Sequence, residues 1–250
     1  MERRTASEFD QELLNLFDQY VHGDIDRRGF LERAGRFAVG GMTAAMLLDS
    51  LSPRFAEAQQ VTRDDKRLRI EWLDYASPQG TGKVRAYLAR PEAVTAKLPG
   101  ILVVHENRGL NPHIEDIARR LALDNFLVLA PDALTPLGGY PGDEDRAREA
   151  FAKLDQTKTR EDFVVAAADV AKIKAPLLIH YAENDDRVNA GWPAYEAALR
   201  ASNVAYTMYR YPGTQHGFNN DTTPRYDRAA AALAWQRTVD FFNKNLRAPG

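Results

Sequence analysis

The chain has 250 residues, of which 44% are hydrophobic and 27% charged, and its formal net charge at pH 7 is -2. This composition is typical of a globular protein with one sizeable core, and the lack of a basic excess argues against nucleic acid as a partner. Because the sequence contains no cysteine, it excludes disulfides, thiolate metal sites and a cysteine nucleophile.

The first 58 residues have the features of a twin-arginine export signal. Paired arginines at positions 27–28 precede an apolar run over residues 37–48, and residues 56–58 read A-E-A, a small-residue cleavage pattern. This pattern predicts the export machinery as a partner, a mature chain that begins near Gln59, and a periplasmic location; without a working signal the location is cytoplasmic. The run is too short for a stable membrane span, which needs about 20 apolar residues.

The same segment also fits an amphipathic helix that packs on the protein and stays there. Apolar side chains recur at helical spacing at Phe9, Leu13, Leu14, Phe17 and Val21. Both interpretations place a boundary after residue 58. We therefore predict an N-terminal region over residues 1–58 and one α/β domain over residues 59–250.

Strand and helix patterns alternate beyond the N-terminal region. An antiparallel hairpin is predicted by the alternation of apolar and polar residues in "RLRIEWLDYAS" and "KVRAYLARP". Strands covered on both faces are predicted by the continuous apolar runs "GILVVHEN", "NFLVLAPD" and "APLLIHYAEND". Helices are predicted over residues 113–122 and in "DEDRAREAFAKL", "GWPAYEAALRAS" and "YDRAAAALAWQRTVDFFNKNL", with a last strand in "AYTMYRYP". We expect a mostly parallel sheet flanked by helices, with ligands outside the carboxyl ends of its strands.

Three polar residues follow the predicted strands. Glu106 ends the "ILVVHE" strand, Asp185 ends the "LLIHYAEN" strand, and His216 lies in the loop between the last strand and the last helix. An acid after a late strand and a histidine in the final loop are the chain order of a hydrolase triad, in which the nucleophile comes first. The histidine takes the nucleophile's proton, and the acid fixes the tautomer of the histidine.

Longer stretches resemble the dienelactone hydrolase family, whose members are carboxymethylenebutenolidase-like, in its exported twin-arginine branch. The resemblance rests on "VVHENRGLNPHIEDIARRLA", "LAPDALTPLGGYPGDED", "VAKIKAPLLIHYAENDDRVNAGWPAYEAAL" and "YPGTQHGFNNDTTPRYD". It implies an α/β-hydrolase fold, hydrolysis of ester or lactone bonds in small molecules, and no cofactor or metal. It also implies catalytic roles for Asp185, His216 and Glu106.

A substrate-binding region is expected around the glutamate. The resemblance implies that the backbone of Asn107, Arg108 and Gly109 lies near the oxyanion hole. Arg108 and Tyr226 are candidates to bind a substrate carboxylate. The alternatives are a surface charge for Arg108 and a core contact of the last helix for Tyr226.

The chain departs from the family pattern at the nucleophile. The family carries a cysteine in a G-x-C-x-G-G elbow between the segments that here read "REDFVVAAA" and "DVAKIKAPLL", and this chain has neither that elbow nor a G-x-S-x-G motif. We predict an internal deletion near residues 167–170 that removes a strand, the elbow, its helix and another strand, roughly fifty residues from the size of such units. Whether the chain is an enzyme is therefore open: it is either an impaired hydrolase or a non-catalytic pseudoenzyme that binds a small ligand or partner.

The loss of a central block predicts a rearranged sheet. Either the strands that flank the deletion close up and pair in parallel, which draws Glu106, Asp185 and His216 together, or the core is compromised.

The sequence offers two other possible sources of chemistry. His105, Glu106, Asp185 and His216 can be imagined as metal ligands, but their spacing is unlike that of metal sites, and we predict no metal. Thr214 is a candidate substitute nucleophile, against its interpretation as a turn residue that bonds the backbone.

Overall fold

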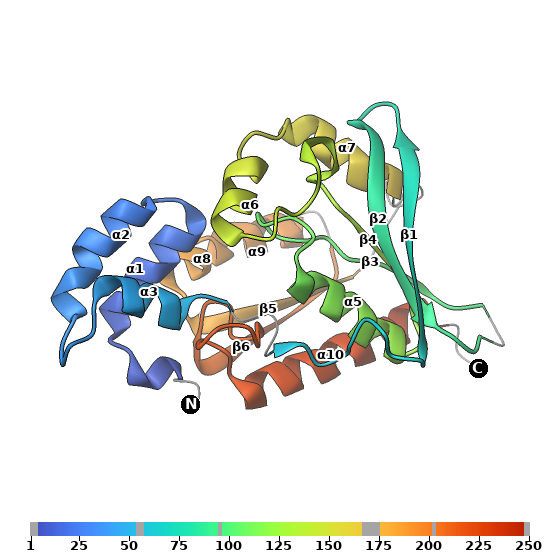
Figure 1. Ribbon diagram of the computed structural model, residues 1–250. Helices are drawn as coiled ribbons and strands as arrows, with labels where there is room; N and C mark the ends of the chain where they lie inside the picture. Colours follow the sequence, from blue (N-terminus) through green and yellow to red (C-terminus); the bar gives the residue numbers. More distant parts are fainter. Residues whose placement is uncertain (1–4, 54–57, 95–96, 167–175, 202–203, 248–250) are drawn as a thin grey trace. The chain divides into compact units, whose positions relative to one another are not determined.

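The computed structural model describes residues 5–53, 58–94, 97–166, 176–201 and 204–247 (Figure 1). It divides into two compact units. The first unit combines Met1–Ala58 with Ala175–Phe241, and the second combines Gln59–Lys174 with Phe242–Gly250. The predicted boundary after residue 58 is one of these divisions, whereas the predicted domain over residues 59–250 is distributed over both units. The predicted deletion point at residues 167–170 lies outside the described residues.

Three α-helices begin the first unit: α1 (Gln11–His22), α2 (Arg27–Ala34) and α3 (Ala44–Leu51). Each begins at a side chain that accepts a hydrogen bond from a free backbone N–H of the first turn, namely Asp10, Asp26 and Thr43. Helix α1 ends at Gly23, whose φ of 87° is one that glycine adopts without strain. Local sequence therefore sets both ends of α1.

The three helices bury a shared apolar cluster, which we call the N-terminal helical cluster. Its buried members are Phe9, Leu13, Leu14, Leu16, Phe17, Tyr20, Phe30, Ala34, Leu47, Leu48 and Leu51. The predicted apolar run over residues 37–48 is not one helix, since it includes the end of a 3-10 turn (Gly35–Phe37), a loop and the start of α3. This packing fits the interpretation of an amphipathic helix that docks on the protein. Among the described residues, no helix combines the length and apolar character that crossing a membrane requires.

The rest of the first unit is built on a parallel pair of strands, β5 (Leu177–Asn184) and β6 (Tyr206–Gln215). This part of the unit also contains three helices, α8 (Asp186–Asn189), α9 (Trp192–Ala201) and α10 (Arg228–Leu246). The last residues of α10 belong to the second unit. The ring nitrogens of His180 contact the hydroxyls of Tyr211 at 2.8 Å and Thr238 at 3.1 Å. His180 is therefore a packed strand residue.

A four-stranded sheet in the order β1-β2-β4-β3 forms the second unit. Its strands are β1 (Leu68–Ser77), β2 (Gly82–Pro91), β3 (Gly100–Leu102) and β4 (Leu127–Pro131), and its helices are α5 (Pro112–Leu123), α6 (Glu144–Phe151) and α7 (Gln156–Ala166). The predicted hairpin is confirmed, with β1 antiparallel to β2 and Leu68 opposite Pro91. Strand β3 is parallel to β4.

Helix α5 is held to the start of the second unit by buried charges. The Asp116 carboxylate accepts hydrogen bonds from the N–H of Val61 at 2.9 Å and from Arg120 Nε at 2.8 Å. Arg119, 1% exposed, donates to the Val61 carbonyl at 2.7 Å and to Tyr87 Oη at 2.9 Å. Since buried charges need partners, this network fixes the segment before β1 against α5.

Strands β3 and β5 each pair along one edge only within the described part of the chain. They belong to different sheets, so the direct pairing that we considered as one consequence of a deletion is not observed. Strand β3 covers three residues instead of the whole run "GILVVHEN", and Val104, just beyond it, is 62% exposed. The first five residues of β5, expected to be covered on both faces, are only partly buried. Partly exposed apolar strands are unusual in parallel pairing, because parallel sheets normally have both faces covered.

Candidate active site

An acid–base pair lies at the carboxyl ends of β5 and β6. Asp185 follows β5 directly and begins α8, where its carboxylate accepts a hydrogen bond from the N–H of Val188. His216 follows the last residue of β6, and its Nδ1 is 2.6 Å from Asp185 Oδ2. The structure thus brings together two of the residues that the sequence singled out. Because a carboxylate only accepts, neutral His216 carries its proton on Nδ1 and presents the lone pair of Nε2.

The surroundings keep the Asp185 carboxylate ionised. Burial raises the pKa of Asp185, but the hydrogen bond and the charge of His216 outweigh burial, so the pKa of Asp185 lies below its ordinary value. The side chain of Asp185 is 7% exposed and that of His216 is 30% exposed. The carboxylate therefore holds the ring from a sheltered position, while the ring is open to solvent on one side.

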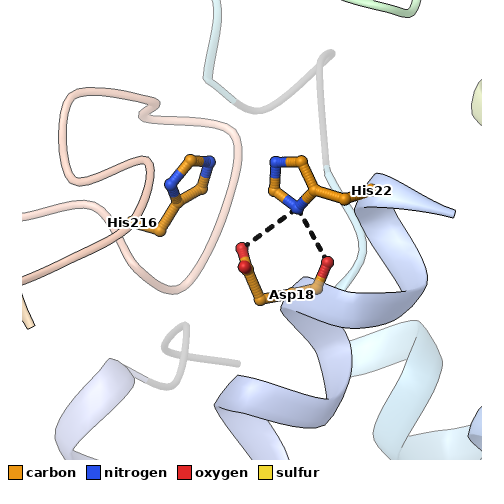
Figure 2. A group of neighbouring side chains, drawn as sticks. All are labelled: Asp18, His22 and His216. Atoms are coloured by element: carbon orange, nitrogen blue, oxygen red, sulfur yellow. Dashed lines mark hydrogen bonds and ion pairs between the residues drawn. The ribbon is translucent and has the colours of Figure 1, made fainter. Parts of the chain in front are cut away.

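Helix α1 supplies polar side chains to the same place. The ring of His22 lies 4.8 Å from that of His216, edge to face (Figure 2). Asp18, one helical turn before His22, forms ion pairs with Arg225 at 3.2 Å and with Arg187 at 3.4 Å. Asp18 and His22 were not among the candidate site residues, because only the apolar face of this helix was considered in the sequence. The signal that identifies them is an aspartate and a histidine four positions apart on the polar face of an amphipathic helix.

The pair opens onto a pocket of about 620 Å³ within the first unit. The pocket is lined by Gln11, Leu14, Asn15, Asp18, Gln19, Asp24, Asn184, Asp185, Asp186, Arg187, Gln215, His216 and Arg225. Four aspartates against two arginines give this lining a formal charge of -2. Five carboxamide side chains add donors and acceptors, so the pocket suits a polar or cationic ligand.

Glu106 and its neighbours belong to the second unit. The Glu106 side chain is exposed, while its backbone carbonyl accepts a hydrogen bond from His105 Nδ1 at 2.6 Å. Gly109 has a φ of 70°, and a Cβ there would lie 2.5 Å from a methyl group of Leu134, so this turn requires glycine. Since each unit is described by itself, the expected grouping of Glu106 with Asp185 and His216 stays a prediction.

Arg108 is buried, so its interpretation as a surface charge is wrong. It is 6% exposed, donates to Asn107 Oδ1 at 2.5 Å, and its Nε lies 3.5 Å from a carboxylate oxygen of Glu144. Burial lowers the pKa of Arg108, and the nearby Glu144 carboxylate opposes that effect. Arg108 therefore braces the loop after β3 against α6.

The metal site imagined around His105 does not fit the structure. His105 is 7% exposed, its Nδ1 donates to the Glu106 carbonyl, and its Nε2 accepts from the N–H of Ala133 at 3.0 Å. Both ring nitrogens are thus occupied by the backbone, and neither has a lone pair left for a metal ion.

Thr214 and Tyr226 are the two remaining candidate residues. Thr214 is 2% exposed and its hydroxyl donates to the Tyr211 carbonyl at 2.7 Å, as expected for a turn residue. Tyr226 is partly buried in the loop before α10, and the described residues that line the pocket do not include it. The contacts of Thr214 do not support a role as a nucleophile, and the role of Tyr226 in substrate binding stays a prediction.

Mild acid is expected to destabilise the protein. Burial holds the pKa of His105 and of His180 below the ordinary value of 6.5. As pH falls below about 6.5 the unfolded chain binds protons that the folded chain does not, so the free energy of unfolding decreases until the folded pKa values are reached. Urea denaturation at pH 7.5 and pH 5.5 measures this change. The change shrinks in His105→Gln, and equal or higher stability at pH 5.5 contradicts the expectation.

Comparison with known proteins identifies the family. Residues 84–172 and 164–246 match the model of the dienelactone hydrolase family, and residues 1–39 match a separate model described as YqhI-like. A protein of Escherichia coli provisionally assigned as a hydrolase fragment, YghX, is 49% identical over 116 residues, which are 46% of this chain and 99% of that protein. One of Salmonella typhi, provisionally assigned as a carboxymethylenebutenolidase, is 27% identical over 220 residues, with 63% of this chain and 81% of that protein covered.

The fold agrees with this assignment. A solved structure from Klebsiella pneumoniae, provisionally assigned as a dienelactone hydrolase, superposes with a TM-score of 0.60 at 22% identity and covers 70% of this chain and 99% of that one. The chain therefore belongs to the dienelactone hydrolase family and has an α/β-hydrolase fold.

Proposed function

We propose that the chain hydrolyses ester or lactone bonds of small molecules weakly, with the Asp185–His216 pair activating water. The observation that carries this proposal is the 2.6 Å contact between His216 Nδ1 and Asp185 Oδ2 at the edge of a polar pocket. Because Nδ1 of His216 donates to Asp185 in this contact, Nε2 of His216 is free to accept a proton. A water that donates to Nε2 is deprotonated as it attacks a carbonyl carbon, which is general base catalysis.

The expected turnover is low because the nucleophile is missing. The sequence contains no cysteine and no glycine-flanked serine elbow. A positioned general base contributes about 10²–10⁴-fold, whereas removal of the nucleophile from a complete triad costs roughly 10⁶-fold in turnover. The Asp185–His216 pair alone therefore supports an impaired hydrolase.

An internal deletion accounts for the missing nucleophile. Three observations support it. The family model matches in two pieces that meet at residues 164–172. The alignment with the Salmonella protein spans 220 residues. It covers only 63% of this chain, which is about 158 of its 250 residues. About 62 residues of the alignment are therefore not matched by residues of this chain. Strands β3 and β5 each have an unpaired edge within the described residues, as expected where neighbouring strands are lost.

His216→Ala is expected to lower the hydrolysis of a p-nitrophenyl ester by about 10²-fold or more, down to the uncatalysed rate, because the base is removed. Initial rates at neutral pH measure the effect. His180→Gln is the matched control, since His180 lies in β5 and keeps hydrogen-bonding partners with glutamine. Turnover that survives His216→Ala rules out water activation by His216. If the unmodified chain has no turnover, it is a non-catalytic member of the family that binds a ligand or partner.

Export by the twin-arginine route is a further proposal, supported by Arg27 and Arg28 at the start of α2. The N-terminal helical cluster supports the alternative, retention of this segment in the folded protein. N-terminal sequencing of the protein recovered from periplasmic and cytoplasmic fractions distinguishes them. A mature periplasmic chain that starts near Gln59 favours export, and an intact N-terminus in the cytoplasm contradicts it.

A further inference from the structure

We propose that Asp18, His22 and His216 bind a divalent transition-metal ion of the zinc class. One ligand atom from each of the three residues lies within 4.8 Å of the others (Figure 2). Two imidazoles and one carboxylate suit Zn²⁺, Co²⁺, Ni²⁺ or Cu²⁺ better than Mg²⁺ or Ca²⁺, which prefer oxygen ligands. All three residues belong to the first unit. Because Asp18 and His22 precede Gln59, the site belongs to the chain that retains residues 1–58 and not to a chain cleaved near Gln59.

The hydrogen bonds of both histidines leave the same nitrogen available. His22 Nδ1 donates to the backbone carbonyl of Asp18 at 2.8 Å, and His216 Nδ1 donates to Asp185 Oδ2 at 2.6 Å. In the neutral rings, each Nε2 then carries a lone pair. Figure 2 shows the Nε2 atoms of the two rings turned toward each other. Two lone pairs that face each other repel, and a cation between them removes the repulsion.

The same bonds are those that orient histidine ligands in metal proteins. A metal-bound histidine usually donates its other N–H to a carboxylate or a backbone carbonyl, which fixes the ring and makes it a better ligand. Asp185 provides the carboxylate for His216, and the carbonyl of Asp18 serves His22. Both supporting contacts are present in the structure.

The charge of the pocket also favours a divalent cation. The lining residues sum to a formal charge of -2, which a divalent cation neutralises. Arg225 and Arg187 contact the Asp18 carboxylate at 3.2 and 3.4 Å, and they hold it in place without using all its lone pairs. Ligands at about 2.1 Å from a tetrahedral zinc lie roughly 3.4 Å apart, so binding requires small rotations of the two rings.

Metal binding and water activation by His216 use the same atom. An ion on Nε2 of His216 blocks its action as a general base, so the weak hydrolysis proposed above belongs to the metal-free form. The metal site does not depend on that hydrolysis, because binding is measured without any turnover.

The test is a titration of the full chain, without a histidine tag and freed of metal by a chelator, with Co²⁺ and Zn²⁺. We expect one ion per chain, seen by the visible absorption of bound Co²⁺ and by calorimetry with Zn²⁺. His22→Gln and Asp18→Asn are expected to weaken binding by about 100-fold or more, and Asp185→Asn by about 10- to 100-fold, since it removes only a supporting contact. His180→Gln, outside the site, should bind as the unmodified chain does.

Circular dichroism and thermal unfolding show that each variant is folded before binding is compared. The proposal is overturned if the unmodified chain binds neither ion, or if a folded His22→Gln or Asp18→Asn variant binds with unchanged affinity.

Discussion

If the proposed deletion is real, insertion of a strand-elbow-helix-strand block between residues 166 and 176 is expected to raise ester hydrolysis by roughly 10³- to 10⁶-fold. By resemblance to the family, we expect the Salmonella relative to supply this block, because about 62 of the 220 residues in its alignment are not matched by this chain. It would restore a glycine-flanked nucleophile to a chain that retains the Asp185–His216 contact. His216 then has a proton to take, and the covalent mechanism that the family resemblance implies can proceed.

The same insertion should also raise thermal stability. By resemblance to the family, the added strands pair with the edges of β3 and β5 that have no partner strand among the described residues, and they cover apolar residues such as Val104, which is 62% exposed. The matched control is the same insertion with its nucleophile replaced by alanine, which should keep the gain in stability and lose the gain in rate. A soluble, stabilised insertion protein with no gain in rate shows that the pair is not positioned for catalysis. An insertion that leaves stability unchanged argues against a deletion at this point of the chain.

Phe30→Ala is expected to lower the free energy of unfolding by about 3–5 kcal/mol, since it removes a large buried ring and leaves a cavity. Phe30 is fully buried, and its ring centroid lies 6.1 Å from that of Phe17 and 5.5 Å from that of Tyr20. A typical domain is stable by only 5–15 kcal/mol, so the loss should loosen α1 together with Asp18 and His22. Urea denaturation of the full chain, followed by circular dichroism, measures the change.

Val39→Ala is the control for this experiment. Val39 is 70% exposed in the loop before α3, and a substitution at such a position changes stability by less than about 0.5 kcal/mol. If Phe30→Ala has as little effect as Val39→Ala, the N-terminal helical cluster is not part of the cooperative fold. That result agrees with a leader that is removed near Gln59.

Several elements and the acid–base pair were predictable from the sequence alone. Period-two alternation predicted the β1–β2 hairpin, and helical spacing predicted residues 113–122, which lie within α5. The contact between Asp185 and His216 was also predictable. Each follows a parallel strand of the same sheet, and the carboxyl ends of such strands meet at one edge.

The partners of these elements follow from the tertiary packing and not from the local sequence. The periodicity of α1 showed that it has an apolar face, but it did not show that its polar face places Asp18 and His22 beside His216. The sequence also left open that Arg108 is buried against Glu144. The physical reason is that periodicity records the environment of one element along the chain. A contact between distant segments depends on packing, which local sequence does not encode.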